Sequence, residues 1–106
     1  MNRFLILALA CFSARAFAAG DADSGKLKSQ ACAACHGADG NGPTGPDFPR
    51  LAGQHYDYLL KALRDYRSGA RRNPIMGAQV GSLGSQDLAD LAAFYSRQKG
   101  SLHVVR

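Results

Sequence analysis

The chain has 106 residues and a formal net charge of +5, with 13 lysine and arginine residues against 8 acidic residues, all of them aspartate. This length fits one domain and excludes a multidomain enzyme, and a hydrophobic content of 46% excludes a disordered chain. The basic residues form no dense stripe interleaved with aromatic residues, which argues against a nucleic-acid-binding protein.

Residues 1–18 have the pattern of an export signal. Arg3 gives a short positive start, and the apolar run over residues 4–12 is too short for a membrane-spanning helix, which needs about 20 residues. Ala16 and Ala18 are the small residues that signal peptidase accepts, so we expect cleavage after Ala18 or one residue to either side. The alternatives are an uncleaved membrane anchor and, with a poorer match, lipid attachment at Cys11.

Cleavage after Ala18 would leave residues 19–106, with two cysteines and a formal net charge of +3. A domain of 88 residues buries a small core and often depends on a metal, a disulfide or a cofactor. We therefore expect one periplasmic domain over residues 19–106, without stable membrane insertion. Its last residues, 99–106, are expected to form a short flexible tail.

The first predicted helix spans residues 23–34. Asp21 or Asp23 can cap it, because a short side-chain oxygen accepts from the free backbone N–H groups at a helix start. Its expected apolar positions are Leu27, Ala31 and Ala34.

Residues 37–53 follow as a loop that is too rich in glycine and proline for a helix or a sheet strand. A loop this long in so small a domain needs something to pack against. We therefore expect a non-protein group beneath it.

Periodicity predicts a second helix over residues 57–68, ended by Gly69. One face of this helix carries an apolar stripe, made of Tyr58, Leu59, Ala62, Leu63 and Tyr66. A second loop is expected over residues 70–84, and it contains Pro74 and Met76.

The third predicted helix begins with Ser85 as N-cap and Asp87 in its first turn, and it ends by Gly100. Its apolar positions recur at helical spacing at Leu88, Leu91, Ala92 and Tyr95. No segment has the pattern of a strand. The sequence therefore predicts an all-α fold of three main helices with long loops.

Cys32-Ala33-Ala34-Cys35-His36 has the C-x-x-C-H spacing of covalent c-type haem attachment. Two cysteines three residues apart can both reach the vinyl edge of a porphyrin, and the adjacent histidine is then held beneath the ring. A redox disulfide, half of a zinc site and a structural disulfide are the alternatives. No second ligand pair at zinc spacing is present, and no strand precedes the motif.

Met76 is the candidate for the second axial ligand, because haem iron in cytochromes c is held by histidine and methionine. It is the only methionine after the predicted signal, and it lies outside the predicted apolar stripes. His55 and His103 are the rival ligands.

Together, these features resemble the class I c-type cytochromes, in particular one half of the diheme cytochrome c-four type and related single-haem bacterial cytochromes. The matching stretches are residues 25–26, 32–42, 46–54, 58–63 and 85–95. The resemblance implies a cytochrome c fold wrapped around one haem. It departs from the diheme members at residues 98–101, where the linker motif is followed only by a few residues instead of a second haem domain, so that the chain is either a single-haem relative or a truncated half.

The resemblance also implies roles for individual residues. Cys32 and Cys35 would form two thioethers to haem c, with His36 as the proximal ligand and Met76 as the distal ligand. The backbone carbonyl of Pro46 would accept the other ring N–H of His36. The first and last helices would cross where Gly25 meets Phe94 or Tyr95.

The function implied is one-electron transfer between a quinol-oxidising complex or dehydrogenase and a terminal oxidase or reductase. With both axial positions filled there is no substrate site, so we expect a monomeric carrier and not an enzyme. The alternatives are a haem subunit of a larger dehydrogenase, or a peroxidase or ligand sensor if Met76 is labile.

Four arginines lie close together in sequence beside Met76: Arg64, Arg67, Arg71 and Arg72. Such a run is usually a solvated face. The four positive charges also make the electrostatic field of the protein uneven, which orients a partner and raises its association rate. We therefore expect an acidic surface on the redox partner, and one of these arginines can also pair with a haem propionate.

Overall fold

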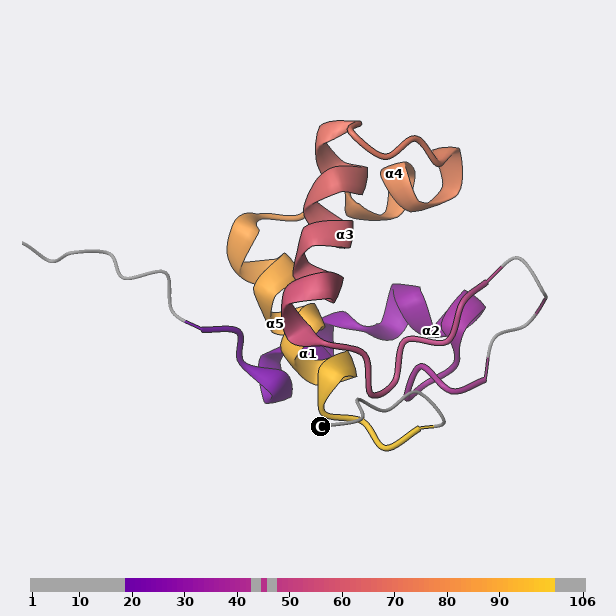
Figure 1. The fold of residues 1–106 in the computed structure, drawn as a ribbon, viewed down its shortest axis with the longest axis vertical. Helices are drawn as coiled ribbons and strands as arrows, with labels where there is room; N and C mark the ends of the chain where they lie inside the picture. Colours follow the sequence, from indigo (N-terminus) through magenta and orange to yellow (C-terminus); the bar gives the residue numbers. More distant parts are fainter. Residues whose placement is uncertain (1–18, 43–44, 46–47, 101–106) are drawn as a thin grey trace, which may run out of the picture.

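The computed structural model describes residues 19–42, 45 and 48–100, and these residues form five helices and no strand. The helices are α1 (Ala22–Lys28), α2 (Gln30–His36), α3 (Tyr56–Ser68), α4 (Pro74–Val80) and α5 (Ser85–Ser96). In Figure 1, α2 and α4 lie on the same side of α3, near its opposite ends. The predicted all-α fold is confirmed for the described part of the chain. None of its helices is long and apolar enough to cross a bilayer.

The first predicted helix is in fact two helices, because the chain breaks at Ser29. The Ser29 hydroxyl donates to the carbonyl oxygen of Lys26 at 2.7 Å, a local bond that competes with the regular helical ladder. Asp21 is the N-cap of α1, and its carboxylate accepts from the N–H groups of Asp23 and Ser24 at 2.9 and 3.0 Å. The sequence offered two caps, and the structure selects Asp21.

The prediction that Leu27, Ala31 and Ala34 form a buried apolar face on this first segment is wrong. Leu27 is 79% exposed, and Ala31 and Ala34 are exposed as well. The buried positions of α1 and α2 are instead Gly25 and His36. The reason is that α1 packs against α5 through its backbone at a glycine and not through an apolar stripe.

The crossing of α1 and α5 has no space for a side chain at Gly25. A Cβ there would overlap the Asp90 carbonyl and come within 2.8 Å of the Cβ of Phe94. This confirms the predicted contact of Gly25 with Phe94.

Asp90 fastens the same crossing with hydrogen bonds. Its carboxylate accepts from the backbone N–H of Asp21 at 2.8 Å and from the Lys28 ammonium at 2.6 Å. Asp87 also pairs with Lys28, at 2.8 Å. The start of the described chain is therefore anchored on α5.

The centre of the fold is α5, in which residues 88–95 are all buried. Its N-cap is Gly84 and not Ser85 as predicted, and the Asp87 carboxylate accepts from the Gly84 N–H at 2.9 Å. The helix ends at Ser96, before Gly100. The core cluster joins α5 to α3 through Leu59, Leu91, Ala92, Phe94 and Tyr95.

The prediction of an unbroken loop over residues 70–84 is wrong, because α4 lies inside it. Pro74 occupies the first turn of α4, where a backbone N–H has no acceptor within the helix, so that the missing N–H of proline costs no hydrogen bond. Asn73 is the N-cap. Met76 therefore lies on a helix. The end of α3 follows the sequence more closely, since Gly69 adopts the left-handed conformation that terminates a helix.

The described part of the loop over residues 37–53 is held against the C-terminal end of α5. The Gly53 N–H donates to the carbonyl of Tyr95 at 3.0 Å, and the Asn41 side chain donates to the carbonyl of Lys99 at 2.7 Å. Lys99 and Gly100, which we expected in the flexible tail, thus lie against this loop. The predicted signal at residues 1–18 and the rest of the tail lie outside the described residues.

Candidate functional site

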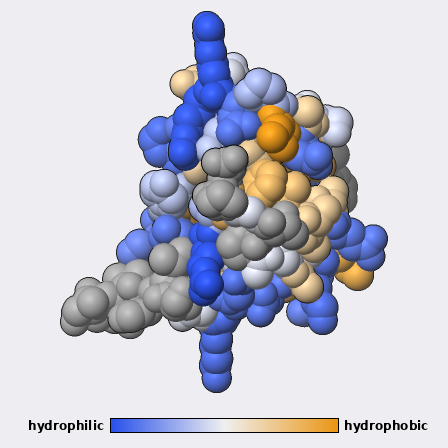
Figure 2. Space-filling view, turned by 90° about the vertical axis from the view of Figure 1, so that its right-hand side faces the viewer, coloured by the Kyte–Doolittle hydropathy of each residue, from blue (hydrophilic) through white to orange (hydrophobic). Residues whose placement is uncertain are grey.

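A cavity of about 580 Å³ lies between α2, α3, α4 and α5 and the segment over residues 48–54. This volume is within the range of about 300–1,000 Å³ that small-molecule and cofactor sites occupy. All five residues of the predicted apolar stripe on α3 line it. In Figure 2, apolar residues gather near the middle of the face turned to the viewer, with hydrophilic residues around them. The stripe therefore faces a site and not only the core.

His36 ends α2 and is the buried histidine of the site, with 5% of its surface exposed. Its Nδ1 lies 2.7 Å from the carbonyl oxygen of Pro49, and the Phe48 ring meets the imidazole edge-on at 6.1 Å between centroids. Because a carbonyl oxygen can only accept, Nδ1 carries the proton. Nε2 is then the ring nitrogen left for a metal, which is the usual arrangement of a metal-binding histidine.

The partner of His36 corrects an expectation, since the acceptor is Pro49 and not Pro46. Pro46 itself lies outside the described residues. Three prolines follow His36 within 13 residues, and the spacing alone does not determine which carbonyl reaches the ring.

Cys32 and Cys35 line the same cavity and are both free thiols. Burial raises the pKa of the Cys32 thiol. The described residues contain no group of three or more His, Cys, Asp or Glu side chains that could hold a metal ion.

Met76 reaches the cavity from α4, so the structure brings it together with His36 although 40 residues separate them. The rival His55 is exposed and does not line the cavity. The second rival, His103, lies outside the described residues.

Tyr95 is buried on the cavity wall, and its hydroxyl has no hydrogen-bond partner in the described structure. Burial raises the pKa of this phenol, so it stays neutral. An apolar wall, an imidazole, a thioether and two thiols together fit a haem, because these are the donor types that c-type cytochromes offer to it. The residues present thus agree with the group that the sequence motif predicts.

The four arginines beside Met76 have different surroundings. The Arg71 guanidinium lies 4.7 Å from the centre of the Tyr66 ring and lines the cavity. Arg67 donates to the carbonyl of Leu83 and to the Ser85 hydroxyl, at 3.3 and 3.4 Å. The remaining two, Arg64 and Arg72, are exposed and lie outside the lining.

Sequence reasoning did not identify Asn73 and Arg50 as site residues, although both line the cavity. A signal for Asn73 was present, since an asparagine directly before a proline is typical of a helix start. No comparable signal marks Arg50.

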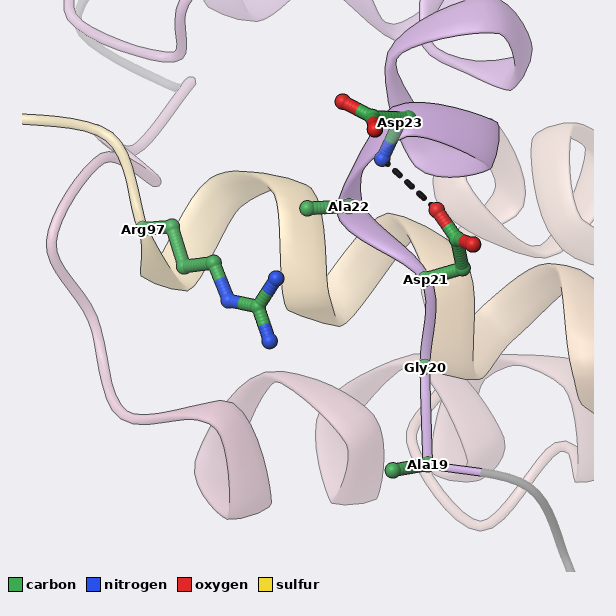
Figure 3. Close-up of a pocket in the computed structure, with 6 residues that line it drawn as sticks. All are labelled: Ala19, Gly20, Asp21, Ala22, Asp23 and Arg97. Carbon is green, nitrogen blue, oxygen red and sulfur yellow. Dashed lines mark hydrogen bonds between the residues drawn. The ribbon is translucent and has the colours of Figure 1, made fainter.

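A second, smaller pocket of about 330 Å³ lies where the chain enters α1 (Figure 3). It is lined by Arg97 and by residues 19–23, and it shares no residue with the larger cavity. It contains no cysteine, histidine or methionine.

The chain is similar to known proteins over most of its length. The sequence model of the family "Cytochrome c" matches residues 22–97. Cytochrome c4 of Pseudomonas aeruginosa is 46% identical over 104 residues, which are 96% of this chain and 51% of the relative. Cytochrome c-554(548) of Halomonas halodenitrificans is 42% identical over 84 residues, covering 76% of this chain and the whole relative.

Among solved structures, reduced recombinant cytochrome c4 from Pseudomonas stutzeri is similar with a TM-score of 0.73 and 45% identity. The match covers 79% of this chain and 48% of that structure. The chain thus spans about half the length of the cytochrome c4 relatives that it matches.

Proposed function

Because this chain belongs to the cytochrome c family, we propose that it is a one-electron carrier with a single covalently bound haem c. Proteins of this family bind haem c covalently and carry electrons. The cytochrome c4 relatives are about twice as long as the stretch that matches this chain. A single haem per chain is therefore part of the proposal.

The observation that carries the proposal is the convergence of the sequence motif and Met76 on one cavity. Cys32, Cys35 and His36 enter it from α2, and Met76 enters it from α4. Segments far apart in the chain thus present the complete donor set of a His/Met haem c to one space.

Each of these residues would have a distinct task. Cys32 and Cys35 would attach the haem through two thioethers. His36 would be the proximal ligand, since its Nδ1 proton is held on the Pro49 carbonyl and its Nε2 is left to bind. Met76 would be the distal ligand. When bound, the haem supplies an iron that takes up and gives up one electron.

The arrangement supports a carrier and not an enzyme. With His36 and Met76 both bound to the iron, no coordination position would be left for a substrate. The apolar wall would exclude water and disfavour the more highly charged iron state, and methionine is a weak donor to that state. Both effects would raise the reduction potential, which would suit transfer from a quinol-oxidising complex or a dehydrogenase to a terminal oxidase or reductase.

The export pattern supports a location for the carrier, and its surface charge supports a kind of partner. The export pattern of residues 1–18 supports a periplasmic protein. The exposed Arg64 on α3 and Arg72 shortly before α4 support an acidic docking surface on a redox partner, to which the carrier would bind as a monomer.

A Met76→Ala variant of the holoprotein tests the proposed ligand set. We expect the weak red charge-transfer band of a Met–Fe(III) bond in the wild type, its loss in the variant, and a lower reduction potential in the variant. Leu27→Ala is the control, because Leu27 is 79% exposed and lies outside the cavity lining. A band that persists in Met76→Ala would contradict the proposal.

A further inference from the structure

The helix that carries Met76 has little to hold it in place. It has seven residues, and isolated helices shorter than about 12–15 residues are marginal in water. Val80, in its last turn, is its buried residue, whereas Ile75 in its first turn is 54% exposed. The first turn of α4, where Met76 lies, therefore needs support from another source.

Asn73 supplies that support with its side chain. The Oδ1 atom accepts from the backbone N–H of Ile75 at 3.0 Å and from the N–H of Met76 at 3.2 Å. Two of the N–H groups that a helix start leaves without partners are thus satisfied by one side chain.

The backbone of Asn73 is prepared for this role by the next residue. Pro74 excludes the helical conformation from the residue before it, and Asn73 accordingly has φ −147° and ψ 115°. An N-cap needs this extended conformation. The Asn73 carbonyl also accepts the first helical bond, from Gly77 at 2.8 Å.

We propose that Asn73 is a positioning residue, whose side-chain oxygen fixes the first turn of α4 and thereby keeps the Met76 side chain in the cavity. This inference rests on the proposed role of Met76 as the distal ligand. Loss of an N-cap side chain typically changes a helix equilibrium by about fivefold. Without the Asn73 oxygen, Met76 should be released about five times more often.

Imidazole binding to the ferric holoprotein measures this release, because imidazole takes the distal position only when Met76 leaves it. The apparent dissociation constant therefore falls as the released fraction rises. For Asn73→Ala we expect binding roughly five times tighter than in the wild type. Asn73→Asp keeps an acceptor oxygen and should bind imidazole as the wild type does.

Asp21→Ala is the matched control, since Asp21 caps α1 with the same pair of bonds, to Asp23 and Ser24. We expect it to lower the stability of the holoprotein without changing imidazole affinity. If both alanine variants tighten imidazole binding equally, the effect is general loosening and the inference is overturned. An unchanged affinity in Asn73→Ala overturns it as well.

Failure of the proposed function looks different in the same assay. If Met76→Ala binds imidazole no more tightly than the wild type, Met76 is not the distal ligand, and the proposed ligand set fails. If Asn73→Ala binds imidazole as the wild type does while Met76→Ala binds it strongly, only the proposed role of Asn73 is wrong.

Amide hydrogen exchange on the wild-type holoprotein tests the cap without any variant. The N-cap of α3 is His55, which makes no side-chain capping bond, so the amides of Asp57 and Tyr58 are the reference. We expect the amides of Ile75 and Met76 to exchange at least severalfold more slowly than these two. Equal rates in both helices would overturn the inference even if Asn73→Ala does not fold.

Discussion

Asp90 is a buried carboxylate on α5, with 2% of its surface exposed, and it accepts from three donors. Burial alone would raise its pKa, but the Asp21 N–H, the Lys28 ammonium and the Gln86 amide together hold the pKa of Asp90 below its usual range. Asp87 also has a lowered pKa, because it pairs with Lys28 and accepts from the Gly84 N–H. Both carboxylates therefore stabilise the fold in their ionised form.

Replacing Asp90 by asparagine should lower the free energy of unfolding by about 2 kcal/mol at pH 7, because the charged acceptor is lost while its donors remain. A carboxyl with a depressed pKa contributes stability above its unfolded value of about 3.9, and this is lost as the pH falls through the folded pKa. The difference between Asp90→Asn and the wild type should thus shrink below about pH 4. Denaturant unfolding at several pH values measures it.

Asp65→Asn is the control for this prediction, because Asp65 pairs with Lys61 on the surface of α3, where an ion pair contributes little. It should leave stability nearly unchanged at every pH. A difference between Asp90→Asn and the wild type that stays constant from pH 7 to pH 3 would contradict the account.

At the scale of elements, the crossing of α1 and α5 leaves no space for a side chain at Gly25. Gly25→Ala forces a Cβ against the Asp90 carbonyl and the Phe94 Cβ, so the two helices must separate. We expect a loss of about 3 kcal/mol in the free energy of unfolding. Thermal unfolding followed by circular dichroism measures the change.

Gly77→Ala on α4 is the matched control, because the nearest atom to a Cβ there, the Tyr66 carbonyl oxygen, is 3.9 Å away. Alanine is favoured over glycine in a helix by about 0.5–1 kcal/mol, so this variant should be neutral or slightly more stable. Equal losses in the two variants would show that the crossing has no special demand for glycine.

The elements also show how far the sequence allows prediction. The α3 stripe and the buried face of α5 follow from periodicity, since both helices are long enough to show it. The helix α4 was missed because its seven residues span only two turns and contain a proline and a glycine. The break at Ser29 depends on one hydroxyl bond to Lys26, for which periodicity gives no sign.

The site was predictable to a different degree. Cys32, Cys35 and His36 were recognisable because their chemistry requires a fixed local spacing. Met76 was found by elimination, and the cavity that it shares with His36 depends on tertiary packing. The acceptor at Pro49 was missed because a loop rich in glycine and proline sets no register from its sequence.

At the scale of the whole molecule, we expect the fold to depend on the proposed haem. Without haem, a cavity of about 580 Å³ lined by side chains of four helices would remain empty. The buried core of the domain centres on α5. A Cys32→Ala/Cys35→Ala variant without haem should therefore be largely unfolded by circular dichroism. A cooperative thermal transition close to that of the holoprotein would contradict this expectation.

Charge at the surface should govern encounters with an anionic partner. Ferricyanide is a simple anionic oxidant, and oxidation of the reduced protein by it should slow as salt rises, since screening acts within about 10 Å at 0.1 M. Arg64→Gln/Arg72→Gln should flatten this salt dependence more than Lys26→Gln/Arg97→Gln, which removes the same charge from α1 and the end of α5. If the oxidation rates of the two double variants depend equally on salt, Arg64 and Arg72 form only a solvated face.

The central claim is that one haem is bound covalently in the cavity through Cys32 and Cys35. The most direct test is acid–acetone extraction of the purified protein, followed by its intact mass under denaturing conditions. The account predicts that the pigment stays with the protein, that each chain gains the mass of one haem, and that the fragment containing residues 32–36 carries it. Haem that leaves with the solvent, or a chain without added mass, would contradict the claim.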